Sequence, residues 1–274
     1  QNPSKLYLNK GQLAFTDVTN VAGVAGKNAW RTGANMADVN GDGLLDIYVC
    51  YSGFGSDSDR ANQLFINGGN NKDGIPVFTE QAATYGLDAV GTYSSQSAFF
   101  DYDQDGDLDM FLLNHAKGFY SPFYNTTRLR NLRHPQFGNR LYRNDNGHFT
   151  EVSAEAGIYG SGINFGLGIA VSDLNNDGWP DILVSNDFNE QDFLYLNNRN
   201  GTFREVCKKS FAHMSRSTMG IDIADYNNDL MPDVVAMDML PEDNYRQKML
   251  KGGDEYDQQT LMKDSGYGYQ YSRN

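Results

Sequence analysis

A nine-residue pattern rich in aspartate occurs four times in the sequence and reads Asp-x-(Asp/Asn)-x-Asp-x-x-x-Asp. The copies are DVNGDGLLD at 38–46, DYDQDGDLD at 101–109, DLNNDGWPD at 173–181 and DYNNDLMPD at 225–233. Side chains at alternate positions of such a loop can point inward together, and their carboxylate and amide oxygens are ligands that Ca²⁺ binds. The pattern therefore predicts a calcium-binding loop in each copy.

Each copy is expected to bind its ion through loop positions 1, 3, 5, 7 and 9. Position 7 offers only its backbone carbonyl in the copies that have Leu44, Trp179 or Met231 there. Gly at position 6 permits a sharp turn with positive φ. The fourth copy has Leu230 at position 6, which disfavours that turn, so it is the weakest candidate, although an ion is still expected there. The predicted ligands are Asp38, Asn40, Asp42, Leu44, Asp46, Asp101, Asp103, Asp105, Asp107, Asp109, Asp173, Asn175, Asp177, Trp179, Asp181, Asp225, Asn227, Asp229, Met231 and Asp233.

Two other interpretations of the loops are less favourable. An EF-hand needs a bidentate Glu at loop position 12 and flanking helices, but position 12 is Val49, Leu112, Val184 or Ala236. Mg²⁺ demands tighter octahedral geometry and keeps its waters. One isolated acidic nonapeptide would indicate an ordinary turn, whereas four copies in the same surroundings favour three to four Ca²⁺ ions. Their role is expected to be structural, because the ligand set leaves no open position for a substrate.

The segments around the loops predict the elements that hold them. Every loop is preceded by a run of small or apolar residues and followed by a β-type run (IYVCY, MFLLN, ILVSN or VVAMD), so it is expected to join two strands. A second strand pair is expected in NQLFIN, NRLYRN and DFLYLN and in the segments that follow them, which begin at Phe78, Phe149 and Phe203. KLYLNKGQLAFTDVT near the start has the same form without a preceding loop. Four short strands per unit of roughly 60 residues are typical of a β-propeller blade.

The composition supports a loop-rich β protein and excludes several classes of function. Of the 274 residues, 28 are Asp and only 7 are Glu, and half of the Asp lie in the four loops. A formal charge of −13 without a basic run argues against nucleic-acid binding. No apolar run approaches the roughly 18 residues of a transmembrane segment. The two cysteines, Cys50 and Cys207, are expected to be unpaired buried thiols rather than a disulfide.

The loops DVNGDGLLD, DYDQDGDLD and DLNNDGWPD, together with NRLYRNDNGHFTEVSAEAGI, resemble FG-GAP/VCBS repeats, the calcium-binding blades of integrin α-subunit propellers. The chain is similar above all to the bacterial branch that resembles the cartilage acidic protein and includes secreted or surface proteins of Bacteroidetes-type bacteria. The resemblance implies an all-β propeller of about seven four-stranded blades, so the chain is expected to be part of a larger ring. Residues 1–240 are expected to form blades, and residues 241–274 a helical insertion or tail that leads into a further blade.

Two segments depart from the repeat. The tail has helix signals in PEDNYRQKMLK and EYDQQTLMK, and it either covers the propeller or docks a partner. An insertion at roughly 115–137 either binds a ligand or contributes cations that pair with neighbouring acidic blades while its aromatic residues pack locally. The second interpretation is favoured. The residues concerned are Lys117, Arg128, Arg130, Arg133, Phe119, Tyr120, Phe123 and Tyr124.

The sequence carries no recognisable catalytic motif. GxSxG, HExxH and the phosphate-binding lysine loop are missing, and the four histidines are isolated from one another. The expected function is therefore that of a non-enzymatic calcium-binding propeller, secreted or on the cell surface, that binds a protein or glycan partner. The bacterial resemblance implies an accessory of an outer-membrane uptake or secretion complex, with its transporter as a partner. The alternative is a propeller-based polysaccharide-active enzyme, a lyase or a hydrolase.

Overall fold

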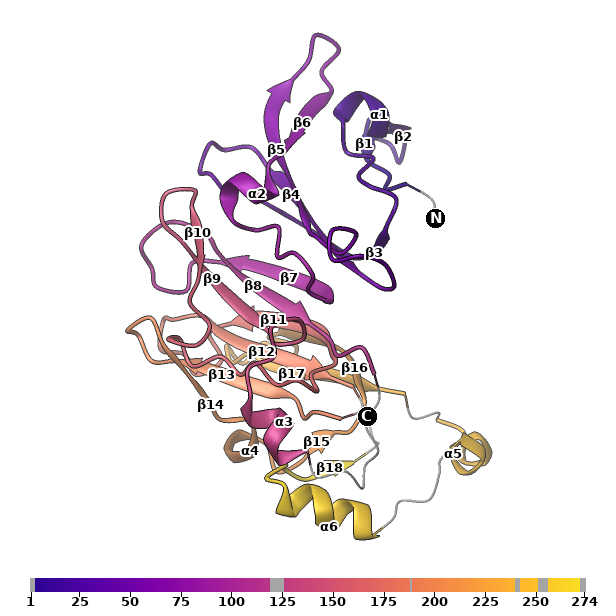
Figure 1. Ribbon diagram of the computed structural model, residues 1–274, viewed down its shortest axis with the longest axis vertical. Helices are drawn as coiled ribbons and strands as arrows, with labels where there is room; N and C mark the ends of the chain where they lie inside the picture. Colours follow the sequence, from indigo (N-terminus) through magenta and orange to yellow (C-terminus); the bar gives the residue numbers. More distant parts are fainter. Residues whose placement is uncertain (1–2, 119–125, 188, 240–241, 251–255, 272–274) are drawn as a thin grey trace.

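An all-β architecture dominates the computed structural model, which describes residues 3–118, 126–187, 189–239, 242–250 and 256–271. Three four-stranded antiparallel sheets follow one another along the chain, and strands adjacent in sequence are adjacent in each sheet (Figure 1). The first sheet comprises β3 (Trp30–Ala37), β4 (Asp46–Ser52), β5 (Gln63–Asn70) and β6 (Pro76–Glu80). The second comprises β7 (Ser94–Phe100), β8 (Asp109–Asn114), β9 (Arg140–Asn144) and β10 (Phe149–Glu151), and the third β11 (Gly166–Ser172), β12 (Asp181–Asn186), β13 (Phe193–Asn197) and β14 (Phe203–Glu205).

Three smaller sheets and six short helices complete the described structure. β1 (Tyr7–Asn9) pairs with β2 (Phe15–Asp17), and β16 (Thr218–Ala224) pairs with β17 (Asp233–Asp238) around the fourth acidic loop. β15 (Met214–Ser215) and β18 (Gln270–Tyr271) pair in parallel. The helices are α1 (Thr19–Ala22), α2 (Ala82–Tyr85), α3 (Thr127–Asn131), α4 (Cys207–Ser210), α5 (Asn244–Leu250) and α6 (Tyr256–Asp264).

The sheets are stacked as blades along the row of their first strands. β3 contacts β7, β7 contacts β11 and β11 contacts β16. Side chains join neighbouring blades, since Thr32 Oγ1 donates to the Ser94 carbonyl at 2.7 Å and Ser95 Oγ donates to the Gly166 carbonyl at 2.7 Å. The close approach needs small residues, because a Cβ on Gly33 would lie 2.6 Å from the Ser95 carbonyl oxygen. The all-β, propeller-type arrangement predicted from the sequence is thus confirmed.

The second strand of each complete blade is buried on both faces because it lies between two neighbours. Every residue of β4, β8 and β12 is buried. Successive side chains of a strand point to opposite faces, so Met110 packs toward Tyr48 of the first blade, whereas Phe111 packs toward Tyr195 of the third. This two-sided burial explains the nearly continuous apolar run after each loop. Cys50 and Cys207 are buried free thiols, as predicted.

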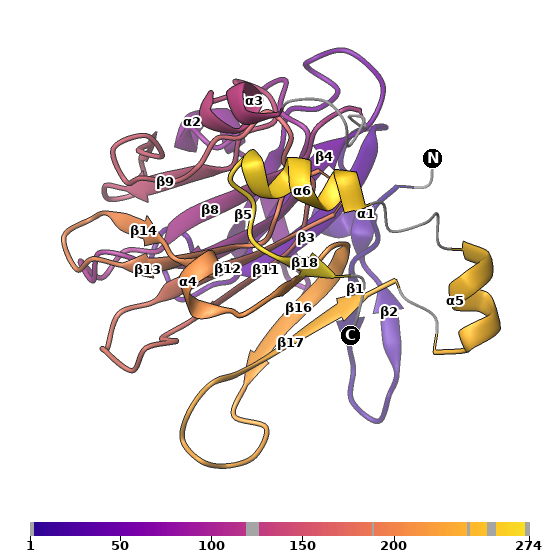
Figure 2. The same ribbon diagram turned by 90° about the horizontal axis from the view of Figure 1, so that it is seen from below.

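The C-terminal segment is helical, as predicted, although its helices differ in their contact with the blades. Figures 1 and 2 show α6 lying across the end of the molecule near β15 and β18, while α5 stands away from the sheets. Within the described ranges, no helix combines the length and the apolar composition of a membrane span.

Part of the insertion contacts the third blade and the tail. Arg130 in α3 forms an ion pair with Glu190 at 2.9 Å, and its guanidinium lies 3.8 Å from the ring centroid of Tyr267. Arg133 lies 3.6 Å from Glu151. These contacts support the interpretation in which the cations of the insertion pair with neighbouring blades. The aromatic residues of the insertion, Phe119, Tyr120, Phe123 and Tyr124, lie outside the described residues.

Candidate metal centre

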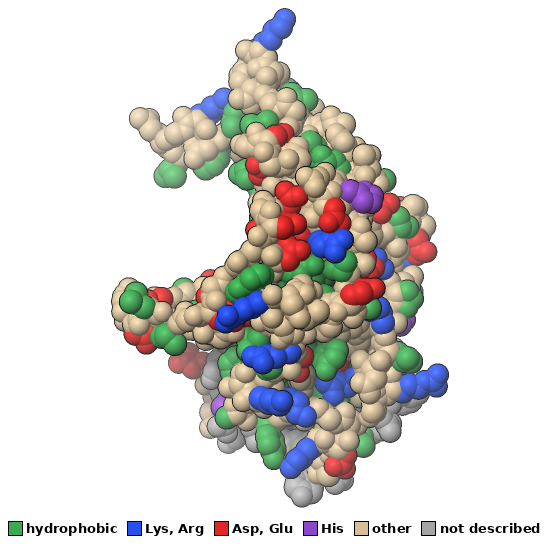
Figure 3. All heavy atoms as spheres, turned by 90° about the vertical axis from the view of Figure 1, so that its left-hand side faces the viewer, with side chains coloured by type: hydrophobic (Ala, Val, Ile, Leu, Met, Phe, Trp, Pro, Cys, Tyr) green, Lys and Arg blue, Asp and Glu red, His purple; other side chains and the backbone are tan. Residues whose placement is uncertain are grey.

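The four acidic nonapeptides are hairpin loops between the first two strands of a blade. Position 9 of each loop is the first residue of β4, β8, β12 or β17. The second, third and fourth loops contact one another in turn, since Gln104 Nε2 donates to the Gly178 carbonyl at 2.6 Å and Asn176 Nδ2 lies 2.9 Å from Met231 Sδ. Figure 3 shows one side of the molecule, where acidic side chains gather with Lys and Arg side chains beside them. The fold therefore brings the second, third and fourth repeats of the sequence together in space.

Backbone N–H groups orient the carboxylates of the second loop. Asp101 accepts from the N–H of Asp105 at 3.1 Å and of Gly106 at 3.0 Å. Asp105 accepts from the N–H of Asp107 at 3.0 Å, and Asp109 accepts from the N–H of Tyr102 at 3.0 Å. The carboxylates at positions 1, 5 and 9 are thus turned into the loop by its own backbone, as in other turns closed by Asp side chains.

The same hydrogen bonds recur in the other three loops. Position 1 accepts from positions 5 and 6, position 5 from position 7, and position 9 from position 2. Leu44, Trp179 and Met231 therefore donate their N–H groups to the position-5 carboxylates. Whether the carbonyls at position 7 bind a metal stays a prediction.

Two positions in every loop adopt a left-handed backbone. Position 6 has φ between 68° and 99°, as predicted for Gly43, Gly106 and Gly178. Leu230 also adopts this conformation, with φ of 68°, so the fourth loop closes in spite of its unfavourable residue. Position 4 has positive φ as well, which was not predicted from the sequence. A signal was present, since Asn and Gly tolerate this region best and three of the four residues there are Gly41, Asn176 and Asn228.

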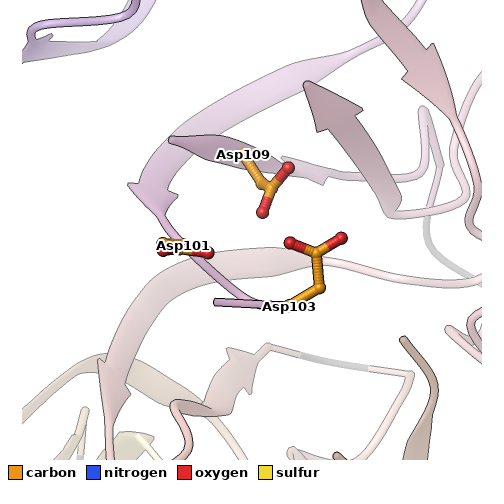
Figure 4. Close-up of side chains that lie close together, drawn as sticks. All are labelled: Asp101, Asp103 and Asp109. Atoms are coloured by element: carbon orange, nitrogen blue, oxygen red, sulfur yellow. The ribbon is translucent and has the colours of Figure 1, made fainter. Parts of the chain in front are cut away.

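The second loop is where three carboxylates converge. Oxygen atoms of Asp101, Asp103 and Asp109 all lie within 4.8 Å of one another (Figure 4). Asp103 Oδ1 is buried and accepts no hydrogen bond from the described residues. A buried carboxylate oxygen without a partner is costly, and a cation at the centre of the cluster would provide the missing contact. The other loops have Asn at position 3, which explains why the same three-acid grouping does not recur among the described residues.

Burial makes these carboxylates electrostatically unfavourable in their charged form. It raises the pKa of Asp109 to about 7, and it raises the pKa of Asp46 and Asp181 at the same position of the other blades. The pKa of Asp103 is raised by burial and then by the charge of Asp105. Desolvation and like charge act in the same direction, so a bound cation would offset the cost of keeping these carboxylates charged.

The candidate ligands are not equally available. Asp107 Oδ2 accepts a hydrogen bond from the Asn146 N–H at 3.0 Å, and Asp107 is not one of the three carboxylates that converge in the second loop. In the third loop, Asp177 is paired with Arg199 at 3.0 Å, so a cationic side chain already contacts a predicted ligand. The side chains of Asp101, Asp103 and Asp109 therefore form the best-developed site, and the remaining ligands stay predictions.

Sequence reasoning missed the asparagines that hold the loops against the blades. Asn144, the last residue of β9, donates to the Leu108 carbonyl of its own loop at 3.0 Å and to the Val39 carbonyl of the preceding loop at 3.3 Å. Asn197 makes the same two contacts one blade further on, to Pro180 and Tyr102. The repeated final Asn of NQLFIN, NRLYRN and DFLYLN was the available signal.

Among the comparisons with known proteins, a family model identifies the repeats of this chain. No curated protein matches the sequence. Among solved structures, the exotype rhamnogalacturonan lyase YesX matches with 15% identity and a TM-score of 0.39, over 76% of this chain and 38% of that chain. The present chain thus spans well under half the length of that structure. A family model described as FG-GAP-like repeat matches residues 1–49, 133–184 and 173–236, which together exceed half of the sequence. The chain belongs to the FG-GAP-like repeat family.

Proposed function

We propose that this chain is a calcium-stabilised propeller that binds a protein or glycan partner outside the cell or on its surface and is not an enzyme. The proposal includes an accessory role beside an outer-membrane uptake or secretion complex. The observation that carries the calcium assignment is the second loop, where Asp103 offers a buried oxygen without a partner next to Asp101 and Asp109. A hard dication offsets the repulsion among these carboxylates and accepts their oxygens as ligands.

The acidity of the chain supports the calcium assignment, and the usual affinity of extracellular calcium modules suits the proposed location. Four filled loops would change the formal charge from −13 to −5, since −13 + 4 × 2 = −5. Extracellular modules bind Ca²⁺ with dissociation constants of about 10⁻⁴ to 10⁻³ M, which suits surroundings rich in calcium. Ion binding to the folded state alone would also raise stability as free Ca²⁺ rises.

Calorimetric titration of the EDTA-treated chain tests the calcium assignment. The wild-type chain is expected to bind three to four Ca²⁺ ions through its four loops, and its melting temperature is expected to rise with free Ca²⁺. Asp103→Asn removes one charge from the cluster, so the ion of the second loop is expected to bind roughly tenfold more weakly.

Asp107→Asn is the matched control for this titration. It removes the same charge from the same loop, but its carboxylate contacts the Asn146 N–H outside the cluster. A smaller effect than that of Asp103→Asn is expected. Fewer than two ions per chain, or a melting temperature that EDTA leaves unchanged, would contradict the calcium assignment.

The binding role needs a separate measurement. A glycan array and a pulldown from native membranes, each carried out with Ca²⁺ and with EDTA, are expected to reveal a calcium-dependent partner. Turnover of a polysaccharide in a screen of substrates would contradict the non-enzymatic part of the proposal and favour a lyase or hydrolase.

A further inference from the structure

We propose that a cavity between the second and third blades is a carbohydrate-binding site, in which one sugar unit of a neutral glycan packs on the face of Trp179. The site would be the place at which a glycan partner binds, so it rests on the proposed function and names both the position and the class of that partner. It lies among residues of two complete blades.

The cavity has the size of a ligand site. Its volume is about 480 Å³, within the range of roughly 300–1,000 Å³ that is typical of small-molecule pockets. Both blades contribute to its wall, so the stacking of the blades creates it. The aromatic and charged side chains of the wall are Tyr102, Asp103, Arg143 and Glu155 from the second blade and Trp179 and Arg199 from the third.

Trp179 gives the cavity a flat apolar surface. Its side chain is partly exposed, and no described residue accepts a hydrogen bond from its indole N–H. The backbone is fixed by the turn of the third loop, since the Trp179 N–H donates to Asp177 at 2.9 Å. An indole combines a large apolar face with one donor at its edge. It therefore suits a pyranose ring, which has an apolar C–H face and a rim of hydroxyl groups.

Tyr102 adds a hydrogen-bonding group to the same wall. The residue is 2% exposed, and its ring centroid lies 5.8 Å from that of Phe203. No described residue forms a hydrogen bond with its hydroxyl, although buried hydroxyl groups normally have a partner. Burial raises the pKa of Tyr102 to about 12, so the hydroxyl keeps its proton and can donate. A sugar hydroxyl in the cavity would provide the missing partner.

Two guanidinium groups of the wall are already oriented. Arg143 donates to Asp145 through Nε at 3.1 Å and through Nη2 at 2.9 Å, and Arg199 Nε donates to Asp177 at 3.2 Å. No described residue accepts a hydrogen bond from Nη1 of either arginine. Exposed ion pairs add little stability, but they fix the remaining N–H groups before a ligand arrives, which reduces the entropy lost on binding.

The charges around the cavity favour a neutral ligand. Each arginine of the wall already faces a carboxylate, and Asp103 and Glu155 add two further acidic groups. One Ca²⁺ ion would not reverse this balance, since the second loop alone has five Asp and −5 + 2 = −3. An acidic ligand would therefore be repelled. Sugar hydroxyl groups both donate and accept, so they match the carboxylates as well as the guanidinium groups.

The two aromatic residues are not a requirement of the repeat. Asn144 Nδ2 donates to the Val39 carbonyl as Asn197 Nδ2 donates to the Tyr102 carbonyl, so Val39 corresponds to Tyr102 one blade earlier. Asp107 corresponds in the same way to Trp179, since both occupy loop position 7. The boundary between the first and second blades thus forms without an aromatic residue at either position, and the aromatic pair is left for a ligand.

Fluorescence titration of a Trp30→Phe variant tests the site. The chain has two tryptophans, and Trp30 is 59% exposed and does not line this cavity, so the variant retains Trp179 alone. The probes are neutral oligomers of glucose, galactose, mannose and xylose, added in the presence of Ca²⁺. At least one of them is expected to change the Trp179 fluorescence in a saturable way. Oligomers of galacturonic acid are expected to bind more weakly.

Substitution of the stacking surface tests the role of Trp179. Trp179→Ala is expected to weaken the binding of the best neutral oligomer roughly tenfold, measured by calorimetry, because the apolar face is lost. The backbone carbonyl of the third loop remains, so the number of Ca²⁺ ions bound is expected to stay the same. Trp30→Ala removes the other tryptophan and is the matched control, which is expected to bind the oligomer as the wild-type chain does.

Substitution of one guanidinium group provides a second variant. Arg143→Gln removes the charged donor and is expected to weaken binding of the same oligomer severalfold. Arg204→Gln is its control, because Arg204 is exposed in β14 and does not line the cavity.

The results that would overturn the site differ from those that would contradict the proposed function. Glycan binding that Trp179→Ala and Arg143→Gln leave unchanged would place the glycan elsewhere, and the proposed function would stand. If no oligomer binds but the pulldown captures a protein partner, the carbohydrate site is wrong and the proposed function again stands. Tighter binding of galacturonic acid oligomers would overturn the neutral class of ligand. Absence of any glycan or protein partner would contradict both proposals.

Discussion

Leu230 occupies the loop position at which the other three loops have glycine, and it adopts φ of 68° there. A left-handed conformation costs an L-residue roughly 1–2 kcal/mol. Replacing Leu230 by glycine removes this cost, but part of the gain in stability is lost because glycine raises the conformational entropy of the unfolded chain. Leu230→Gly is therefore expected to stabilise the chain by about 0.5–1 kcal/mol, measured from the midpoint of urea unfolding at a fixed calcium concentration.

Gly178→Leu provides the matched control for this strain. Gly178 has φ of 85° at the same position of the third loop, and a Cβ there would meet no atom within 4 Å. Its substitution is expected to destabilise the chain through backbone strain alone. An unchanged urea midpoint in both variants would show that the left-handed turn carries no measurable strain.

Asp192 is expected to make stability depend on pH. Burial raises its pKa to about 7, although it accepts hydrogen bonds from the Asn186 N–H and the Thr218 hydroxyl at 2.8 Å each. The folded pKa lies above the usual value of about 3.9, so the stabilising contribution is complete below about pH 4 and is lost as pH rises to about 7. Asp192→Asn is expected to remove this loss, which amounts to roughly 1–4 kcal/mol, in urea titrations between pH 4 and 8.

Asn62 offers the reciprocal control because it holds the same place in the first blade. Its Oδ1 accepts from the Tyr51 N–H at 2.9 Å, and its Nδ2 donates to the Ser94 hydroxyl at 3.0 Å. Asn62→Asp is expected to add a loss of stability toward neutral pH. If neither substitution changes how the free energy of unfolding depends on pH, the pH dependence of stability does not arise at this position.

At the scale of the elements, the end of the third strand of a blade joins that blade to its neighbour. Asn144 is 2% exposed, and its Nδ2 donates hydrogen bonds to backbone carbonyls of two different loops. Its Oδ1 accepts a hydrogen bond from the Gly147 N–H at 2.7 Å. Asn144→Ala leaves these groups without partners and is expected to cost roughly 2–3 kcal/mol. Urea unfolding, combined with hydrogen exchange of β3 and β4, measures the global and local effects.

Asn67→Ala is the control within the same repeat. Asn67 Nδ2 donates a hydrogen bond to the Leu45 carbonyl of its own loop at 3.1 Å. No described residue of a preceding loop accepts a hydrogen bond from Asn67. Its loss is expected to cost less than the loss of Asn144. Equal costs would mean that the contact between blades adds no stability.

At the scale of the whole molecule, one buried ion pair ties the insertion and the tail to the third blade. Glu190 is 1% exposed, and Arg130 donates both to this carboxylate and to the Ser265 carbonyl at 3.2 Å. Arg130→Met leaves the Glu190 carboxylate buried and unpaired and is expected to destabilise the chain by roughly 3–5 kcal/mol. Thermal unfolding measures the loss, and limited proteolysis shows whether the tail is released.

The double variant Arg130→Met/Glu190→Gln separates the pair from its packing. It removes the unpaired charge and is expected to recover most of the stability, because replacing both members of a buried pair is often nearly neutral. If the double variant is as unstable as Arg130→Met, the contact with Tyr267 rather than the ion pair holds the tail.

The sequence by itself determined the repeat, the strands around each loop and the all-β architecture. The signals are local, because strand alternation, turn residues and the spacing of Asp within nine residues all act over one hairpin. The hydrogen bonds that the Asp101 carboxylate accepts from the N–H groups of Asp105 and Gly106 span only four and five residues. The nonapeptide therefore sets most of its own turn geometry, which is why a hairpin loop could be predicted there, whereas its metal ligands stay predictions.

Only the tertiary structure decided how the repeats are joined and which loop is the best-developed site. Asn144 reaches the Val39 carbonyl across 105 residues, and Arg130 reaches Glu190 across 60. Asp103 Oδ1 is left buried without a partner by the packing of its blade, although Asn occupies the same position in the other three loops. Such features depend on the distance between blades and on what covers each side chain, and neither quantity is encoded in the spacing of residues along one hairpin.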